Sequence, residues 1–556
     1  MKSRNIRELR GLSLFAVLLV VATVLSQSAR ETQREFRDPE TEKDACTSIM
    51  VGRLATKDGS VITAHTCDGN YRNWLNIVPR QKHEKGATTK IHWGTLHTES
   101  AWDLKGKIQK GEIPQIEETY AYLNTAYPCL NEKQLAIGET TIMGRKELQN
   151  DEGLFLIEEL ERVTLERCRT AREAIRLIGE LAGKYGYGDD GECITIADPK
   201  EVWQFEIFGA GPAQIGAVWA AARIPDDHVG VSANIPRISE INLKDPDHFM
   251  ASENVVSLAE EMGWYDSKKG EPFRFWKAYS VRKPFADREL YILSTLAPSL
   301  NLKQEAEELP FSVKPSKLLA IGDVLKYYRE TYEGTDFDMT KNLMVPKSRQ
   351  SPRDKKQEAE DKPQELIKSP VASAWMGEDM ITLVNALKPG TVERRRTIAI
   401  ARCAYSEVIQ CRSWLPDEIG GIAWFSFDNP AQSPRFPIFS GVLSLPKSFE
   451  IDSQQRYQPE SASWAFRRAN RLATLKWGVL RKSIEEGISE FEMRAMEELP
   501  AIEKTALDYY KSDDVEQGRV KCKQYLTRYT NDFARAAIHK WSELGDTFWG
   551  QFARGF

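Results

Sequence analysis

The sequence has 556 residues, of which 41% are hydrophobic, and a formal net charge of −5. A chain of this length can bury a large core, and its length alone suggests several domains. Because no basic stripe offsets the negative charge, the composition argues against nonspecific nucleic-acid binding. The eight cysteines form no CxxC pair and the seven histidines no His-Glu-x-x-His motif, so we expect neither a metal site nor a bound cofactor.

The first 28 residues have the pattern of a secretory signal peptide. Four basic residues precede the almost continuously apolar run 12–25, and small residues follow it. This run is shorter than the ~20 apolar residues of a membrane span. We therefore expect a cleaved signal and a secreted or periplasmic protein; the alternative is an uncleaved segment that tethers the protein to a membrane. Residues 29–45 are charged and almost free of large apolar groups, which is typical of a spacer or propeptide.

Residues 46–69 predict two strands joined by a tight turn. Asp58-Gly59 supplies the positive-φ residues of a hairpin, and the flanking runs are rich in β-branched residues. Cys46 stands at the start of the first strand, directly after a polar segment. If the preceding segment is removed, Cys46 carries a thiol and a free α-amine, which together form a nucleophile and its base. The alternative is a small, buried cysteine that begins a strand.

Strands and helices alternate in the rest of the chain. Periodicity and composition predict a strand over 134–138, a helical region over 151–183, strands over 193–197, 202–207, 215–224 and 229–234, an exposed loop over 346–370, strands over 396–401 and 406–411, and helices over most of 461–556. This order fits layered sheets that are covered by helices.

Blocks spread over nearly the whole chain after residue 45 carry a resemblance to a known family. They are Cys46 to Gly52 with Asp58 to Ser60 and Ala64 to Asp68, Asn131 to Arg145, Trp203 to Glu206, Trp219 to Asp226, Ser232 to Arg237, Tyr332 to Thr340, and Trp414 to Trp424. In this order they resemble the family C69 dipeptidases, which are cysteine N-terminal-nucleophile (Ntn) hydrolases related to secernins and to penicillin V and bile-salt acylases. The resemblance implies an α+β fold, a four-layer αββα sandwich over residues 46–460, with a helical C-terminal part, residues 461–556, packed on the same domain.

The resemblance also implies three catalytic residues. Cys46 is the nucleophile, and Asp68 occupies the acidic position that contacts its α-amine; the Asp68 carboxylate is alternatively an anchor for the ammonium end of a short substrate. Asn234 is expected to donate a hydrogen bond to the developing oxyanion. The alternative for Asn234 is a turn residue that caps its own backbone.

The chain departs from the patterns of its relatives in two places. Residues 139–141 occupy the position of an oxyanion-hole asparagine in the acylases, so the hydroxyls or backbone amides of Thr140 and Thr141 are the candidate donors. His65 stands where the C69 pattern usually has arginine. Because the ordinary pKa of histidine is near ~6.5, the charge at this position is conditional at neutral pH.

The expected hairpin gives His65 a position relative to the nucleophile. A two-residue turn at 58–59 pairs Gly52 with His65, and side-chain alternation then places His65 on the face of Cys46. The same count places Asp68 on the opposite face, unless a bulge or the strand end turns it back. If His65 supplies a positive charge near the thiolate or the substrate carboxylate, His65→Arg flattens the pH dependence of kcat/KM between about pH 5.5 and 7.5. The alternative is a core histidine bonded to a backbone carbonyl.

The function implied by the resemblance is that of a secreted cysteine dipeptidase, which hydrolyses dipeptides through a thioester on Cys46. One alternative is an amidase or acylase of the same superfamily that acts on another N-acyl amide, such as penicillin V or a bile conjugate. A second alternative is a non-catalytic, secernin-like binding protein. The expected partners are small peptides, with no nucleic acid and no stable membrane span after signal removal, and homo-oligomerisation is left open.

Overall fold

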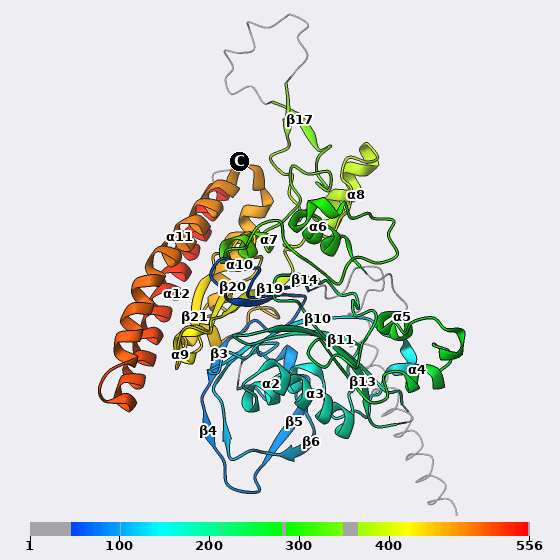
Figure 1. Ribbon diagram of the computed structural model, residues 1–556. Helices are drawn as coiled ribbons and strands as arrows, with labels where there is room; N and C mark the ends of the chain where they lie inside the picture. The colour runs from blue at the N-terminus through cyan, green and yellow to red at the C-terminus, as the bar shows by residue number, and fades with distance from the viewer. Residues whose placement is uncertain (1–45, 101, 213, 281–284, 348–364, 554–556) are drawn as a thin grey trace, which may run out of the picture. The chain divides into compact units, whose positions relative to one another are not determined.

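Two antiparallel sheets lie at the centre of the molecule (Figure 1). The computed structural model describes residues 46–100, 102–212, 214–280, 285–347 and 365–553. Residues from Cys46 onward form one compact unit. The expected signal peptide and spacer, residues 1–45, lie outside the described residues, as does most of the expected loop 346–370.

The first sheet contains the strand that follows Cys46. Its order is β16-β14-β1-β2-β19-β20-β21, and its strands are β16 (Ser312–Val313), β14 (Val229–Ser232), β1 (Ser48–Val51), β2 (Val61–Asp68), β19 (Cys403–Cys411), β20 (Ile422–Phe427) and β21 (Phe436–Phe439). Every residue of β1 and β2 is buried. Their β-branched and apolar side chains suit central strands that are covered on both faces.

The second sheet is the larger one. Its order is β15-β13-β12-β11-β10-β9-β8-β3, and its strands are β15 (Phe249–Ala251), β13 (Ala217–Arg223), β12 (Val202–Gly209), β11 (Glu192–Ala197), β10 (Ala136–Thr141), β9 (Leu130–Asn131), β8 (Tyr122–Asn124) and β3 (Asn76–Val78). The described residues also form three two-stranded sheets: β4 (Gln81–Lys82) with β7 (Glu118–Thr119), β5 (Thr88–Trp93) with β6 (Ile108–Pro114), and β17 (Met344–Pro346) with β18 (Leu366–Lys368).

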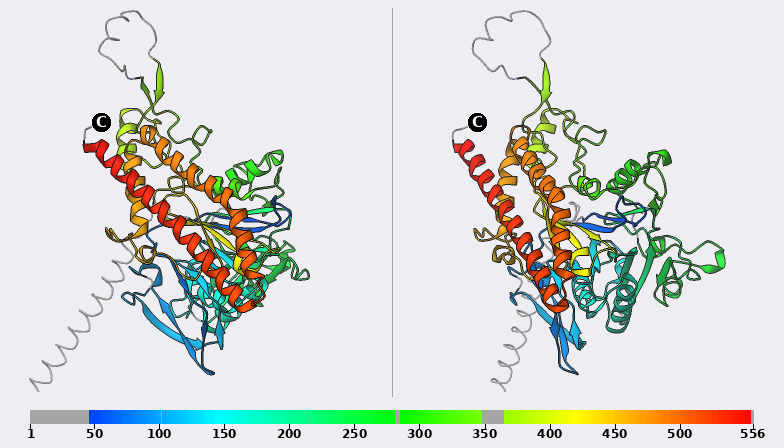
Figure 2. Two further views of the ribbon diagram at one scale, coloured as in Figure 1. Left: turned by 90° about the vertical axis from the view of Figure 1, so that its left-hand side faces the viewer. Right: turned by 60° about the vertical axis from the view of Figure 1, so that its left-hand side comes forward.

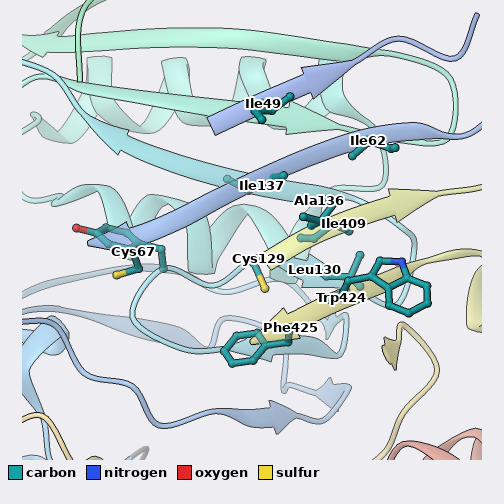
Figure 3. Close-up of a cluster of buried hydrophobic side chains, with 14 of the residues drawn as sticks. Ile49, Ile62, Cys67, Cys129, Leu130, Ala136, Ile137, Ile409, Trp424 and Phe425 are labelled. Atoms are coloured by element: carbon teal, nitrogen blue, oxygen red, sulfur yellow. The ribbon is translucent and has the colours of Figure 1, made fainter. Parts of the chain in front are cut away.

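The two large sheets lie face to face. Thr63 of β2 and Thr195 of β11 bring their hydroxyl oxygens within 2.5 Å, and Ser48 Oγ donates to the carbonyl of Glu139 at 3.2 Å. A Cβ at Gly138 of β10 would lie 2.8 Å from the Thr195 hydroxyl, so glycine permits this close approach. Figure 3 shows apolar side chains from β1, β2, β10, β19 and β20 buried together in the core.

Helices cover the outer sides of both sheets. The helices are α2 (Ile157–Arg167), α3 (Ala171–Tyr185), α4 (Ser257–Glu261), α5 (Phe275–Tyr279), α6 (Asp287–Leu296), α7 (Ile321–Tyr327), α8 (Glu378–Leu387), α9 (Asp417–Gly420), α10 (Ala462–Leu475), α11 (Trp477–Tyr510) and α12 (Val515–Ala553), with short 3₁₀ turns at Thr95–His97, Lys146–Leu148, Ser267–Lys269, Pro298–Leu300 and Lys447–Glu450. Helices α2 and α3 pack on the second sheet, and α6, α7 and α10 pack on the first. The long helices α11 and α12 lie side by side and contact β21 (Figure 2).

Most predicted elements are present. The helical region 151–183 is confirmed as α2 and α3, and the mostly helical C-terminal part as α10 to α12. The expected strand over 396–401 is wrong. The Ala399 amide donates to the Glu330 carbonyl at 3.0 Å, and its carbonyl accepts from the Trp375 indole at 2.9 Å, so this segment is held outside the sheet.

The expected two-residue hairpin turn is also wrong. Ser48, not Gly52, pairs with His65, which shifts the register by four residues. The connection 52–60 does not turn straight back to β2. The Gly52 amide donates to the His228 carbonyl at 3.0 Å, which extends the β1–β14 pairing, and the Leu54 amide donates to the Asp226 carbonyl at 2.7 Å. Since the shift is an even number of residues, the faces predicted by alternation are unchanged.

Candidate active site

Cys46 lies directly before β1 and is fully buried. Thr47 joins this end of the chain to β2, because its amide donates to Thr66 Oγ1 at 3.0 Å and its carbonyl accepts from the Thr66 amide at 3.1 Å. The Tyr328 hydroxyl donates to the same carbonyl at 3.1 Å. The backbone that follows the thiol is therefore fixed by bonds to β2 and by a buried tyrosine.

Asp68, at the end of β2, contacts the thiol through its backbone. Its amide donates to Cys46 Sγ at 3.5 Å. Its carboxylate accepts from Thr66 Oγ1 at 2.8 Å and from Arg396 Nη2 at 2.6 Å, and its Oδ1 has no hydrogen-bond partner among the described residues. The pairing of β19 with the end of β2 is irregular between Cys403 and Tyr405, which is the kind of bulge that the sequence analysis required.

Asn234 follows β14 in a left-handed conformation, with φ of 65°. Its Nδ2 donates to the Thr141 carbonyl at 2.7 Å, and its Oδ1 accepts from Arg288 Nη2 at 3.0 Å. Arg288 also donates to the Cys46 carbonyl at 2.5 Å and to Thr47 Oγ1 at 2.7 Å. This buried arginine of α6 thus connects the two candidates, Cys46 and Asn234, and no motif in the sequence marks it.

The two threonines have different positions. The Thr140 hydroxyl lies 2.8 Å from Ser232 Oγ and joins the two sheets. Thr141 donates through its hydroxyl to Glu139 Oε1 at 3.1 Å and accepts from Asn234 through its carbonyl. The side chain of this segment within hydrogen-bonding reach of Cys46 is Glu139, which the sequence analysis did not single out as a candidate.

His65 is fully buried and lies opposite Glu407 of β19. Its Nδ1 is 3.2 Å from Glu407 Oε1, an ion-pair distance that lacks the direction of a hydrogen bond. Tyr127 and Tyr405 contact the imidazole edge to face. Burial lowers the pKa of His65, but Glu407, with Glu139 and Asp68 behind it, outweighs burial and raises that pKa above its ordinary value.

The thiol of Cys46 is buried beside two acidic side chains. Its pKa is raised well above the ordinary value, first by burial and then by the charges of Glu139 and Asp68, while the Asp68 amide lowers it. In this form of the chain the sulfur therefore keeps its proton. Nucleophilic chemistry at Cys46 requires a base or a cation in addition to the described side chains.

Two cavities lie away from this site. One, of about 270 Å³, lies between α6 and α7, and the other, of about 380 Å³, lies beside α11; Cys46 lines neither. The described residues contain no cluster of three or more His, Cys, Asp or Glu side chains arranged for a metal ion. Among the described helices, none is both long enough and apolar enough to cross a membrane.

Comparison with known proteins agrees with the resemblance. A protein from Latilactobacillus sakei named probable dipeptidase is 24% identical over 465 residues, which cover 80% of this chain and 84% of that protein. A probable dipeptidase from Salmonella dublin is 25% identical over 454 residues (77% and 86%), and a probable dipeptidase B from Lactococcus lactis is 22% identical over 438 residues (76% and 80%). The family model for peptidase family C69 matches residues 45–490, well over half of the sequence, and the chain therefore belongs to this family.

Proposed function

We propose that this chain is a cysteine dipeptidase with Cys46 as an N-terminal nucleophile. The observation that carries the proposal is the position of Cys46 at the start of the compact unit, with its sulfur held by the Asp68 amide and its carbonyl by Arg288. The relatives named probable dipeptidase support the substrate class.

The base in the proposed reaction is the α-amine that removal of the preceding residues creates. Its ordinary pKa of about 7.7–8.0 suits it to accept a thiol proton near neutral pH. Asp68 Oδ1, which accepts no hydrogen bond from the described residues, is available to the amine of its neighbour Cys46. The thiolate attacks the carbonyl carbon of the dipeptide, the proton leaves with the departing amine, and water then hydrolyses the thioester and restores the thiol.

Asn234 is the proposed oxyanion donor. Arg288 on its Oδ1 and the Thr141 carbonyl on its Nδ2 fix the direction of the amide. A donor that is already oriented costs no reorganisation when negative charge develops on the substrate oxygen.

The proposal extends to the fold and to the maturation of the chain. Two facing sheets with helices on their outer sides are compatible with the αββα sandwich of Ntn hydrolases. We further propose that residues 1–28 direct secretion and that residues 29–45 are removed by self-cleavage before Cys46. The sequence pattern of this segment supports both steps.

The test combines the mass of the mature protein with substitution of Cys46. The purified active enzyme should begin at Cys46. Cys46→Ala should keep the fold, retain residues 29–45 and hydrolyse no dipeptide, and Cys46→Ser should retain at most a trace of activity because a hydroxyl ionises less readily than a thiol. Active protein that still carries residues 29–45, or wild-type turnover by Cys46→Ala, would refute the proposal.

A further inference from the structure

Glu139 of β10 is a second buried carboxyl group beside the Cys46 thiol. It lies within hydrogen-bonding reach of both Cys46 and Glu192, and Thr141 Oγ1 donates to its Oε1 at 3.1 Å. Burial, then the charge and hydrogen bond of Glu139, raise the pKa of Glu192 well above its ordinary value. Burial also raises the pKa of Glu139, but the hydrogen bonds from Glu192 and Thr141 and the charge of His65 act in the opposite direction. Glu139 Oε2 has no hydrogen-bond partner among the described residues, so this fully buried carboxyl group keeps an open acceptor oxygen.

The nearby cations are committed to other groups. Arg396 pairs with Asp68 at 2.6 Å, and His65 lies 3.2 Å from Glu407. No lysine, arginine or histidine of the described part of the chain forms an ion pair with Glu139, although its side chain is fully buried. A buried carboxylate without a cation is costly, so this position favours a positively charged ligand.

We propose that Glu139 binds the α-ammonium group of the substrate and so selects peptides with a free N-terminus. The inference rests on the proposed dipeptidase function, which it deepens by assigning a residue to substrate selection. It gives the ammonium group a partner within the second sheet, on the strand that also carries Thr141.

Ordinary covalent geometry places an ammonium group close to this carboxylate during the reaction. In an α-aminoacyl group the nitrogen lies about 2.5 Å from the carbonyl carbon. That carbon must approach the attacking sulfur to roughly 3–3.5 Å. A carboxylate that contacts Cys46 is therefore within reach of the ammonium. A carboxylate has about four lone-pair sites, so Glu139 keeps acceptor capacity beyond its bonds to Thr141 and Glu192.

The reaction brings two amino groups to the site, and the structure offers two carboxylates for them. Asp68 is the partner of the Cys46 amine, since its own amide already contacts Sγ and its Oδ1 is open. Its other oxygen is held by Thr66 and Arg396, which offset its charge. Glu139 forms no ion pair within the described residues, and its open Oε2 is left for the substrate. An N-acylated peptide brings no cation, so it leaves Glu139 buried and unpaired and binds poorly.

The test measures recognition of the amine separately from turnover. Alanyl chloromethyl ketone and its N-acetyl derivative alkylate a reactive cysteine, and mass spectrometry gives the rate constant at Cys46. For mature wild-type protein we expect the free-amine reagent to react about 100-fold faster. In Glu139→Gln the preference should fall below about 5-fold, and Glu139→Asp, which keeps the charge, should restore most of it. Glu161→Gln is the matched control and should keep the wild-type preference. Glu161 is also fully buried and has carboxylate oxygens without hydrogen-bond partners among the described residues, but it does not contact the thiol.

Each other outcome contradicts the inference, the proposed function or both. A wild-type preference in Glu139→Gln, or an equal loss of rate with both reagents, overturns it, since the second result indicates a packing or proton-transfer role. Wild-type protein that cleaves dipeptides but shows no preference between the reagents overturns the inference and leaves the proposed function standing. A clear preference without dipeptide cleavage refutes the proposed function and leaves the amine site standing. If neither reagent modifies Cys46, Cys46 is not the nucleophile, and both the proposed function and the inference fail.

Discussion

Arg288→Met tests the connection between the nucleophile and the oxyanion donor. Arg288 is almost completely buried. Its Nη1 donates to the Cys46 carbonyl and to Thr47, and its Nη2 donates to the carbonyl of Ala233 at 3.2 Å and to Asn234. Methionine fills similar space but leaves all four acceptors without these donors.

The expected loss follows from those four bonds. A hydrogen bond to a charged group contributes about 1.5–3 kcal/mol, but bonds that share one side chain are not additive. Removal of one member of a buried charged network costs about 3–5 kcal/mol, and we expect a loss in this range. Catalysis should suffer separately, because displacement of Cys46 or Asn234 by about 1 Å lowers kcat/KM roughly 100-fold.

Urea unfolding and dipeptide kinetics at a temperature where the variant remains folded separate the two effects. Arg412→Met is the matched control. Arg412 is equally buried and donates to the carbonyls of Gly420 and Ile419. Its loss should lower the urea midpoint by a similar amount and leave kcat/KM nearly unchanged. The reasoning is refuted if Arg288→Met keeps wild-type kcat/KM, or if both variants lose activity equally.

Two further predictions concern stability. Because the pKa of His65 is raised, its ion pair with Glu407 is fully stabilising below the ordinary histidine pKa and is lost as pH rises through the raised value. The difference in unfolding free energy between wild type and Glu407→Gln should therefore be largest near about pH 6 and shrink towards about pH 9. A difference that stays constant with pH in urea unfolding would contradict this. Gly52→Ala should lower the free energy of unfolding by about 1–3 kcal/mol, because its Cβ would clash with the Asp226 carbonyl. Gly183→Ala, in an exposed and open position of α3, should instead raise it by about 0.5–1 kcal/mol. Thermal melts that show equal effects for the two variants would refute the contrast.

Local patterns carry enough information to predict the strand that positions Cys46. The β-branched runs on either side of residues 58–59 predict β1 and β2, and alternation predicts that His65 shares a face with Ser48. The register fails because the contacts that keep Gly52 from pairing with β2 come from residues 226–228, which no local rule takes into account. The raised pKa of His65 has the same origin, since Glu407 is 342 positions away in sequence and beside it in the sheet.

The residues that surround the nucleophile were harder to predict. Arg288 and Arg396 are two of the 76 lysines and arginines, and no local motif sets them apart. Arg288 meets Cys46 across 242 positions, and Arg396 meets Asp68 across 328. Glu139 directly precedes the two candidate oxyanion donors, Thr140 and Thr141. Its importance depends on its proximity to the thiol and to Glu192, which only the packed sheets reveal.

The charges around Cys46 give an order to the proposed reaction. Within the described residues, burial and the charges of Glu139 and Asp68 raise the pKa of the Cys46 thiol and so oppose formation of the thiolate. Release of the α-amine supplies a base and a first positive charge beside Asp68. Binding of the substrate ammonium supplies a second beside Glu139. Each amine offsets a charge that opposes the thiolate, so the nucleophile gains reactivity only when the chain has been processed and a substrate with a free amine is present. The acidic side chains that raise the pKa of the Cys46 thiol thus also make the proposed reaction selective for substrates with a free amine.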